Sequence, residues 1–288
     1  RLREKGVEVE VSDSSSTNLE LARDLLGGIQ NLEDPEVILI AVPPQNVFDV
    51  LKAEFHSHSK AIFIEVSGIK SELILQVESF TELSRRFVAV HPMAGREKSG
   101  PQSARSDLFE SRAWIISKTS EVDPDVVEFA RDLGKVLGSS IYEMTADSHD
   151  QAIATISHMP QILSSALGAS LLGSTSESLN LAGQGLRDVS RLADSDPELW
   201  STLLIGNAKH LIPKLAEVTS RLSQLQKALE EANVPVVKNF IAEGRIGREK
   251  IPGKHGGKSR DYSYVPIVID DKPGGLARIF NECAAIGV

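Results

Sequence analysis

The sequence predicts an α/β protein: a doubly wound domain of alternating strands and helices, followed by an all-helical domain. Three observations lead to this prediction. Short, almost uninterrupted apolar runs alternate with helix-like segments over the first half of the chain. Strand patterns stop after Thr145. Beyond that point, apolar residues recur at helical spacing and include one regular heptad repeat.

The first half of the chain has the pattern of a parallel sheet that is covered on both faces. Strands buried on both faces are almost continuously apolar, and parallel strands are joined by crossover helices. Residues 7–11 instead alternate between valine and glutamate, which is typical of a strand with one exposed face. The expected strands are residues 7–11, 37–42, 61–66, 87–90 and 114–116, and the expected helices are residues 17–26, 44–55, 71–79 and 124–137.

The beginning of the chain lacks two parts of a dinucleotide-binding fold. Residues 1–6 have the pattern of a helix end that stops at Gly6, with no strand and no glycine-rich turn before it. That turn normally holds the pyrophosphate. We therefore expect a Rossmann-type domain without its first strand and glycine-rich loop, and a chain that binds NAD more weakly than a longer parent. The predicted divisions are a dinucleotide-binding domain (1–145), a helical substrate and dimerisation domain (146–252), a linker (253–260) and a partial further domain (261–288).

A long helix is predicted over residues 147–172, and it contains Pro160. Proline removes one helical hydrogen bond and displaces the carbonyl four residues earlier, so the helix should bend beside His158. The bend either shapes the core or directs His158 into a cleft, and the sequence leaves both open. His149 lies nine positions before His158, which should place the two on opposite sides of the helix. With no close cluster of metal-ligating residues, we predict no metal site.

A heptad repeat occupies residues 207–231. Its apolar positions are separated by four and three residues in turn: Leu211, Leu215, Val218, Leu222, Leu225 and Leu229. This spacing fits either a core helix of the same chain or a helix that pairs across a homodimer. Its regularity favours the dimer.

Polar or turn-forming residues follow the predicted strands at the edge where open α/β sheets bind ligands. Asp13 suits the ribose hydroxyls of NAD, or it caps a helix. Pro43 fixes a turn where a cofactor would cross, or it merely joins strand and helix. Ser67 offers a hydroxyl beside a glycine, or a helix cap. His91 is the strongest candidate for proton exchange, although a lone histidine is more often structural.

Three motifs together resemble the prephenate/arogenate dehydrogenase family, and the resemblance covers nearly the whole chain. They are His91-Pro92-Met93-Ala94-Gly95, Ser157-His158-Met159-Pro160, and the stretch 185–200 that contains Arg191. The resemblance implies NAD-dependent oxidative decarboxylation of prephenate to 4-hydroxyphenylpyruvate, or of arogenate to tyrosine. It also implies a homodimer formed through the helical domain.

The resemblance assigns roles to individual residues. His91 takes the proton of the substrate hydroxyl, Ser67 holds that hydroxyl and the cofactor, and His158 lies near the nicotinamide and the substrate. Arg191 binds the ring carboxylate, for which a planar guanidinium is well suited. Glu97 and Asp188 match an ionic gate beside the site, and Trp200 is structural or part of the site wall. The implied cofactor contacts are Asp13, Pro43, Ser67 and His158.

The last segment resembles the start of an ACT domain, a small amino-acid-sensing module. A predicted strand over residues 264–269 is followed by Asp270-Asp271-Lys272-Pro273-Gly274 and the start of a helix. Only this first unit is present. The resemblance implies regulation by tyrosine in the full-length protein.

Composition narrows the remaining alternatives. A net charge of −9 argues against a nucleic-acid-binding surface. The single Cys283 fits a reducing cytosol, and we find no membrane-spanning run and no signal peptide. Two rival functions remain from the sequence: a 6-phosphogluconate-type reductase with a similar domain order, and a non-catalytic dimer that senses amino acids.

Overall fold

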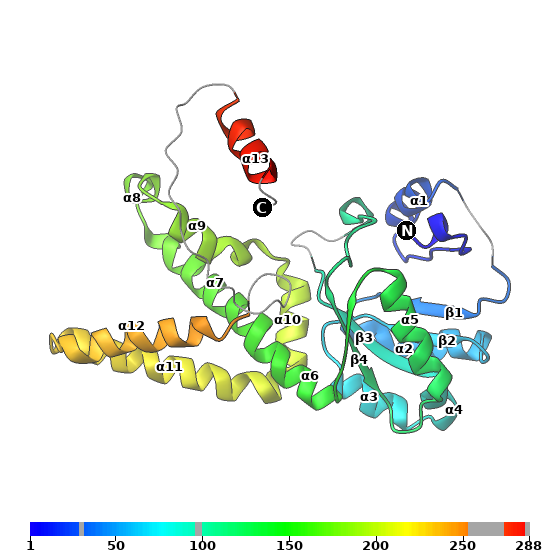
Figure 1. The fold of residues 1–288 in the computed structure, drawn as a ribbon. Helices are drawn as coiled ribbons and strands as arrows, with labels where there is room; N and C mark the ends of the chain where they lie inside the picture. The colour runs from blue at the N-terminus through cyan, green and yellow to red at the C-terminus, as the bar shows by residue number, and fades with distance from the viewer. Residues whose placement is uncertain (29–31, 96–99, 253–273, 286–288) are drawn as a thin grey trace. The chain divides into compact units, whose positions relative to one another are not determined.

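The computed structural model describes residues 1–28, 32–95, 100–252 and 274–285 (Figure 1). The chain forms two compact units, Arg1–Phe240 and Ile241–Val288. The first unit contains a five-stranded sheet and, after it, a series of helices. None of the described helices is both long and apolar enough to span a membrane.

The sheet has its strands in sequence order. The first three strands are parallel, the fourth runs antiparallel to the third, and the fifth is parallel to the fourth. The strands are β1 (Val37–Ile40), β2 (Ile62–Glu65), β3 (Phe87–Pro92), β4 (Ala113–Lys118) and β5 (Ser140–Glu143).

The prediction of a wholly parallel sheet is therefore wrong for β4, and β5 was not predicted. A parallel connection needs a long crossover, usually a helix. The described part of the connection from β3 to β4 holds only a short 3₁₀ turn, Pro101–Ser103, so β4 returns antiparallel. The apolar run did not reveal this direction because β4 is buried on both faces in either case.

The predicted strand over residues 7–11 is also wrong. This segment forms no strand and is largely exposed. Asp13 therefore follows an irregular segment.

Helices cover both faces of the sheet, as predicted for a doubly wound domain (Figure 1). Phe63 and Phe87 pack with helices α2 and α3 in one core cluster, whereas the adjacent Ile64 and Val88 pack with α5 in a second cluster. The four predicted helices begin and end within two residues of their expected limits. The helices of this part are α1 (Ser16–Leu25), α2 (Pro44–Ser57), α3 (Ser71–Glu78), α4 (Thr81–Arg86) and α5 (Pro124–Val136).

After β5 the described chain is helical. The long helix predicted over residues 147–172 is interrupted by a π-helical turn, Ala154–His158, immediately before Pro160. Proline lacks the donor that a regular α-helix would use there. The helices are α6 (Ala146–Ile153), α7 (Met159–Ser170), α8 (Ser176–Asn180), α9 (Gln184–Ser190), α10 (Pro197–Gly206), α11 (Ala208–Glu230), α12 (Val234–Glu249) and α13 (Gly275–Ala285).

Helix α11 carries the heptad repeat, and alternate members of the repeat differ in exposure. Leu211 is buried, and Val218 packs against the same small core. Leu215, Leu222 and Leu229 are 39%, 50% and 61% exposed. One half of the repeat thus packs within the chain, and the other half forms an exposed apolar row at heptad spacing.

The predicted ACT-like strand (264–269) and the linker (253–260) lie outside the described residues. Helix α13 begins at Gly275, where the sequence predicts a helix start.

Candidate active site

Three candidate residues lie at the same edge of the sheet because they follow parallel strands. Glu65 at the end of β2 pairs with Ala89 of β3. Ser67 and His91 each lie two residues beyond this pair, so they are level with each other. Pro43 lies three residues beyond Ile40, which pairs with Glu65. The edge is the one at which open α/β sheets bind ligands.

His91 is partly buried and contacts a second histidine that the sequence analysis did not assign to the site. Its Nδ1 atom lies 2.8 Å from Nε2 of His149, and the two ring centroids are 5.0 Å apart. Burial, together with the positive charge of Lys70, holds the pKa of His91 well below its usual value. The His91 ring is therefore neutral at pH 7 and able to accept a proton.

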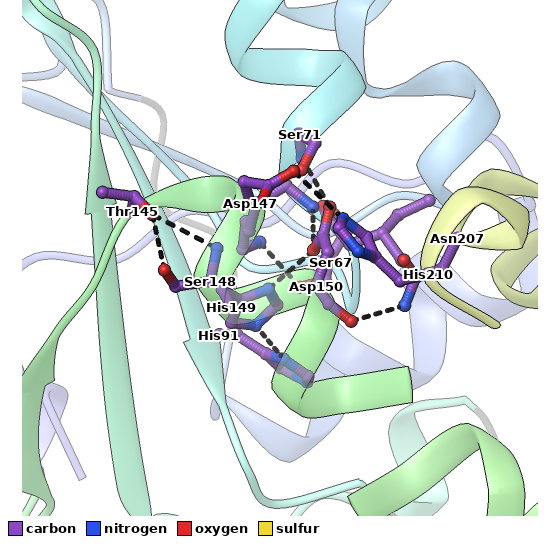
Figure 2. Close-up of polar contacts among 12 residues, drawn as sticks. Ser67, Ser71, His91, Thr145, Asp147, Ser148, His149, Asp150, Asn207 and His210 are labelled. Atoms are coloured by element: carbon purple, nitrogen blue, oxygen red, sulfur yellow. Dashed lines mark hydrogen bonds and ion pairs between the residues drawn. The ribbon is translucent and has the colours of Figure 1, made fainter. Parts of the chain in front are cut away.

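Asp150 holds His149 in place. One carboxylate oxygen, Oδ1, lies 2.7 Å from His149 Nδ1 and accepts a hydrogen bond from the backbone N–H of Lys70 at 2.9 Å. The other oxygen accepts from Ser71 N–H at 2.8 Å, at the first turn of α3. Burial disfavours the charged carboxylate, but hydrogen bonds from His149 and Ser71 outweigh it and lower the pKa of Asp150. Figure 2 shows this chain of contacts from Ser71 through Asp150 and His149 to His91.

The loop that carries Ser67 is fixed by a buried ion pair between Lys70 and Glu65. Lys70 Nζ also donates to the Ser67 carbonyl at 2.7 Å, and Glu65 accepts from Ser67 N–H at 2.7 Å. The Ser67 hydroxyl donates to the Ile69 carbonyl at 3.1 Å, which leaves its oxygen able to accept. Burial lowers the pKa of Lys70, although Glu65 opposes this change.

His158 ends the π-helical turn and is buried. Asn207 Nδ2 lies 3.2 Å from its Nδ1, and Trp200 packs edge-on at 5.9 Å between ring centroids. Burial, with a contribution from His149, lowers the pKa of His158 to about 4. Both His149 and His158 are buried, and the π-helical turn lies between them, so the regular helix on which their expected opposite placement was based is interrupted. A π-helical turn contains an extra residue and changes the phase of the helix.

Arg191 begins a 3₁₀ turn, Arg191–Asp194, and its side chain is exposed. The turn is tied to α7 by Gln161, whose Nε2 donates to the Leu192 carbonyl at 2.8 Å. Gly168 of α7 lets the turn pack closely against this helix, since a Cβ built on Gly168 would lie 3.1 Å from the Cβ of Ala193. Gln161 is one turn beyond His158, so the same helix carries one candidate and anchors the other.

The remaining candidates have local partners or lie outside the description. Asp13 Oδ1 accepts from Ser15 N–H at 2.8 Å in the turn before α1, and the residue that caps the helix is Ser15. Asp188 accepts from Gln184 at 2.7 Å, one turn earlier in α9. Glu97 lies outside the described residues, so its pairing with Asp188 is not described.

The edge near His91 carries donors and acceptors that suit a nicotinamide and a small acid. A Cβ built on Gly68 would lie 3.9 Å from His91 Nε2 and 3.0 Å from Leu203, so a larger residue would fill the space beside that nitrogen. Ser67, His91 and His158 provide neutral donors and acceptors. In the described part of the chain, no group of three or more His, Cys, Asp or Glu side chains is arranged to hold a metal.

Two family models match the chain. Residues 1–143 match the nucleotide-binding domain of prephenate dehydrogenase, and residues 145–243 match its dimerisation domain. The chain belongs to the prephenate dehydrogenase family. It thus belongs to a family of NAD-dependent oxidoreductases.

Individual relatives agree with this assignment. The chain is 28% identical to a probable prephenate dehydrogenase of Streptomyces niveus, over 100% of this chain and 83% of the relative. It is 25% identical to the prephenate dehydrogenase of Bacillus subtilis, over 89% and 71%. Among solved structures, the arogenate dehydrogenase of Synechocystis is 26% identical with a TM-score of 0.69, covering 86% of this chain and 93% of that one. Prephenate dehydrogenase of Aquifex aeolicus, solved with hydroxyphenyl propionate and NAD+, has a TM-score of 0.75 at 24% identity, over 86% and 91%.

Several residues of the site were missed by the sequence analysis. His149 and Asp150 precede the motif around His158, Asn207 follows α10, and Gln161 lies inside α7. All four are buried polar residues; three lie on helices, and Asn207 lies between α10 and α11. Buried polar side chains need partners, so a polar residue on an otherwise apolar helix face was the available signal. Identifying the partner required the fold.

Proposed function

We propose that this member of the prephenate dehydrogenase family converts prephenate to 4-hydroxyphenylpyruvate, with CO2 and NADH as the other products. The observation that carries the proposal is the neutral imidazole of His91 at the sheet edge, level with Ser67 and with its Nε2 atom 3.9 Å from a Cβ built on Gly68. A neutral ring at this place suits general base catalysis.

His91 takes the proton of the substrate's 4-hydroxyl on Nε2. The C4–H bond breaks as the hydride leaves, and the bond between the ring and its carboxylate breaks to release CO2. The electron pair of that bond completes the aromatic ring, and the proton returns to the same oxygen. Atoms and charges then balance with one hydride transferred.

NAD+, when bound, would supply the hydride acceptor, which is the chemistry that the protein cannot supply alone. Pro43, Ser67 and His158 are the residues that would contact the nicotinamide end. Asp13 would accept hydrogen bonds from the adenosine ribose and repel a 2′-phosphate, which favours NAD over NADP. The Asp13 carboxylate would have to serve the ribose in addition to Ser15.

Arg191 binds the ring carboxylate of the substrate through its two-pronged guanidinium. Ser67 accepts from, or donates to, the reacting hydroxyl, and His158 orients the substrate near the nicotinamide. The resemblance assigns an ionic gate beside the site to Asp188 and Glu97, of which Glu97 lies outside the described residues. The packing of the Arg191 turn on α7 supports this assignment, because that helix also carries His158.

Arogenate is the second candidate substrate, and the similarity to the Synechocystis arogenate dehydrogenase favours keeping it. Prephenate and arogenate differ only in a keto or an amino group on the side chain. The groups described at the sheet edge address the ring hydroxyl and the ring carboxylate, which the two substrates share.

Two further parts of the proposal concern assembly and regulation. The match to a dimerisation domain and the exposed leucines of α11 support a homodimer that pairs through this helix. The segment that resembles an ACT domain would bind tyrosine and inhibit the enzyme when the remainder of that domain is present.

A steady-state assay of NADH formation tests the proposal. Prephenate, arogenate and 6-phosphogluconate are each supplied with NAD+ or NADP+, with and without tyrosine. We expect turnover of prephenate with NAD+ and release of CO2. Turnover of 6-phosphogluconate alone would favour the reductase alternative. If no substrate is turned over but tyrosine binds, the sensing alternative is favoured.

A further inference from the structure

We propose that Asp150 and His149 are positioning residues that determine which nitrogen of His91 carries the proton. They hold His91 with its proton on Nδ1 and its lone pair on Nε2, while Asn207 holds His158 in the opposite tautomer. The role assigned to the lone pair rests on the proposed function. The tautomers themselves are argued from the hydrogen bonds, with the ring of His149 neutral.

The argument begins at Asp150, which is 2% exposed. Its two oxygens accept from the backbone N–H groups of Lys70 and Ser71, and the N-terminus of a helix stabilises negative charge. The lowered pKa of Asp150 agrees that the group is ionised. An ionised carboxylate accepts hydrogen bonds and donates none. His149 Nδ1, 2.7 Å away, must therefore carry a proton.

His149 transmits this constraint to His91. Its ring is 0% exposed, and the proposal takes this ring as neutral, with a single proton. A neutral ring with a proton on Nδ1 has its lone pair on Nε2. That lone pair lies 2.8 Å from His91 Nδ1, so His91 donates its own proton there. The Nε2 atom of neutral His91 then has a free lone pair beside Gly68.

Asn207 produces the opposite result at His158. Its side-chain nitrogen lies 2.8 Å from the backbone carbonyl of Asp150, which only accepts, so the orientation of the amide is fixed. The second hydrogen on that nitrogen points to His158 Nδ1 at 3.2 Å. His158 Nδ1 is thus an acceptor, and the proton of the neutral ring is on Nε2. The two histidines offer the substrate one acceptor and one donor.

The tautomers are measured directly in the chain without ligands. Long-range ¹⁵N–¹H NMR of histidine-labelled protein distinguishes protonated from unprotonated ring nitrogens, and the single variants His91→Gln and His158→Gln assign the signals. We expect His91 protonated on Nδ1 and His158 on Nε2 near neutral pH. A proton on Nε2 of His91, or a doubly protonated His149, would overturn the proposal. This readout needs no turnover, so it is independent of the identity of the substrate.

Two variants of His149 test the consequence for catalysis. His149→Gln keeps an acceptor near His91 Nδ1, whereas His149→Leu removes it. We expect kcat to fall by on the order of 10²–10⁴-fold in His149→Leu, the usual contribution of a positioned base, and by less than about tenfold in His149→Gln. The KM for prephenate should change little in both.

A purely structural role would give a different pattern. Both variants would then lower thermal stability and kcat together, with no rescue by glutamine. A folded His149→Leu variant with the kcat of the unaltered chain would contradict the proposal. If the leucine variant does not fold, the NMR result on the unaltered chain decides.

Discussion

Gln161 Nε2 donates to the Leu192 carbonyl over 2.8 Å, and this contact joins the turn that begins at Arg191 to the helix that begins beside His158. Gln161 Oε1 also accepts from Ser195 at 3.3 Å, at the other end of that turn. A single buried side chain therefore holds both ends of the segment proposed to bind the substrate carboxylate.

Replacing Gln161 should weaken substrate binding more than it slows the chemical step. Gln161→Leu removes both contacts, and one lost neutral hydrogen bond costs about 0.5–1.5 kcal/mol. We expect KM for prephenate to rise by about 2- to 13-fold, with kcat changed by less than about threefold. Ser165→Ala is the matched control, because it removes only the contact of Gln161 within α7. Equal KM values in the two variants would argue against an anchoring role.

Replacing Arg191 itself should lower activity on prephenate more than replacing Gln161 does. A hydrogen bond to a charged group contributes about 1.5–3 kcal/mol, so Arg191→Ala should lower kcat/KM for prephenate by about 10- to 150-fold. Arg187→Ala changes an exposed arginine one turn earlier in the chain and serves as the control. If both variants lose the same small amount of activity, Arg191 is a surface residue.

The pH profile should show a base with a low pKa. His91 faces Lys70, His149, His158 and Asp150, and burial and the nearby positive groups lower its pKa well below the usual 6.5. The neutral ring is the active form, so protonation removes activity and a lower pKa moves this loss to lower pH. We expect kcat/KM to keep its full value at about pH 6.5 and to decline only in more acidic buffer. Half-maximal activity at or above about pH 6.5 would contradict this assignment.

The exposed leucines of α11 should control assembly. Leu222→Glu places a charge in the middle of the exposed row, which should separate a dimer into monomers in analytical ultracentrifugation. Leu181→Glu changes a leucine that is 87% exposed outside that row, and it should leave the sedimentation unchanged. A monomeric unaltered chain, or a Leu222→Glu variant that remains a dimer, would exclude pairing through this row.

The local sequence pattern predicted most of the helices and strands, but it predicted less well which strands pair and in which direction they run. The helices that start at Pro44, Ser71 and Pro124 were predicted because apolar spacing and proline at the first turn are local signals. The direction of β4 was missed, because a strand that is buried on both faces has the same apolar pattern whether it runs parallel or antiparallel. Residues 7–11 alternate like a strand but form an irregular segment, which the local pattern does not reveal.

The same limit applied to the site. His91 and Ser67 were predicted from their places after strands, since strand ends converge at one edge. His149 was set aside because nine residues of regular helix place it opposite His158. The π-helical turn between them changes that relation, and its position depends on how the helix accommodates Pro160 in the packed structure.

The most direct test of the proposed chemistry compares the unaltered chain with His91→Gln in the prephenate-dependent formation of NADH. We predict that the substitution lowers kcat by on the order of 10²–10⁴-fold, while NAD affinity measured by calorimetry stays the same. Prephenate turnover by the variant at the rate of the unaltered chain would contradict the account.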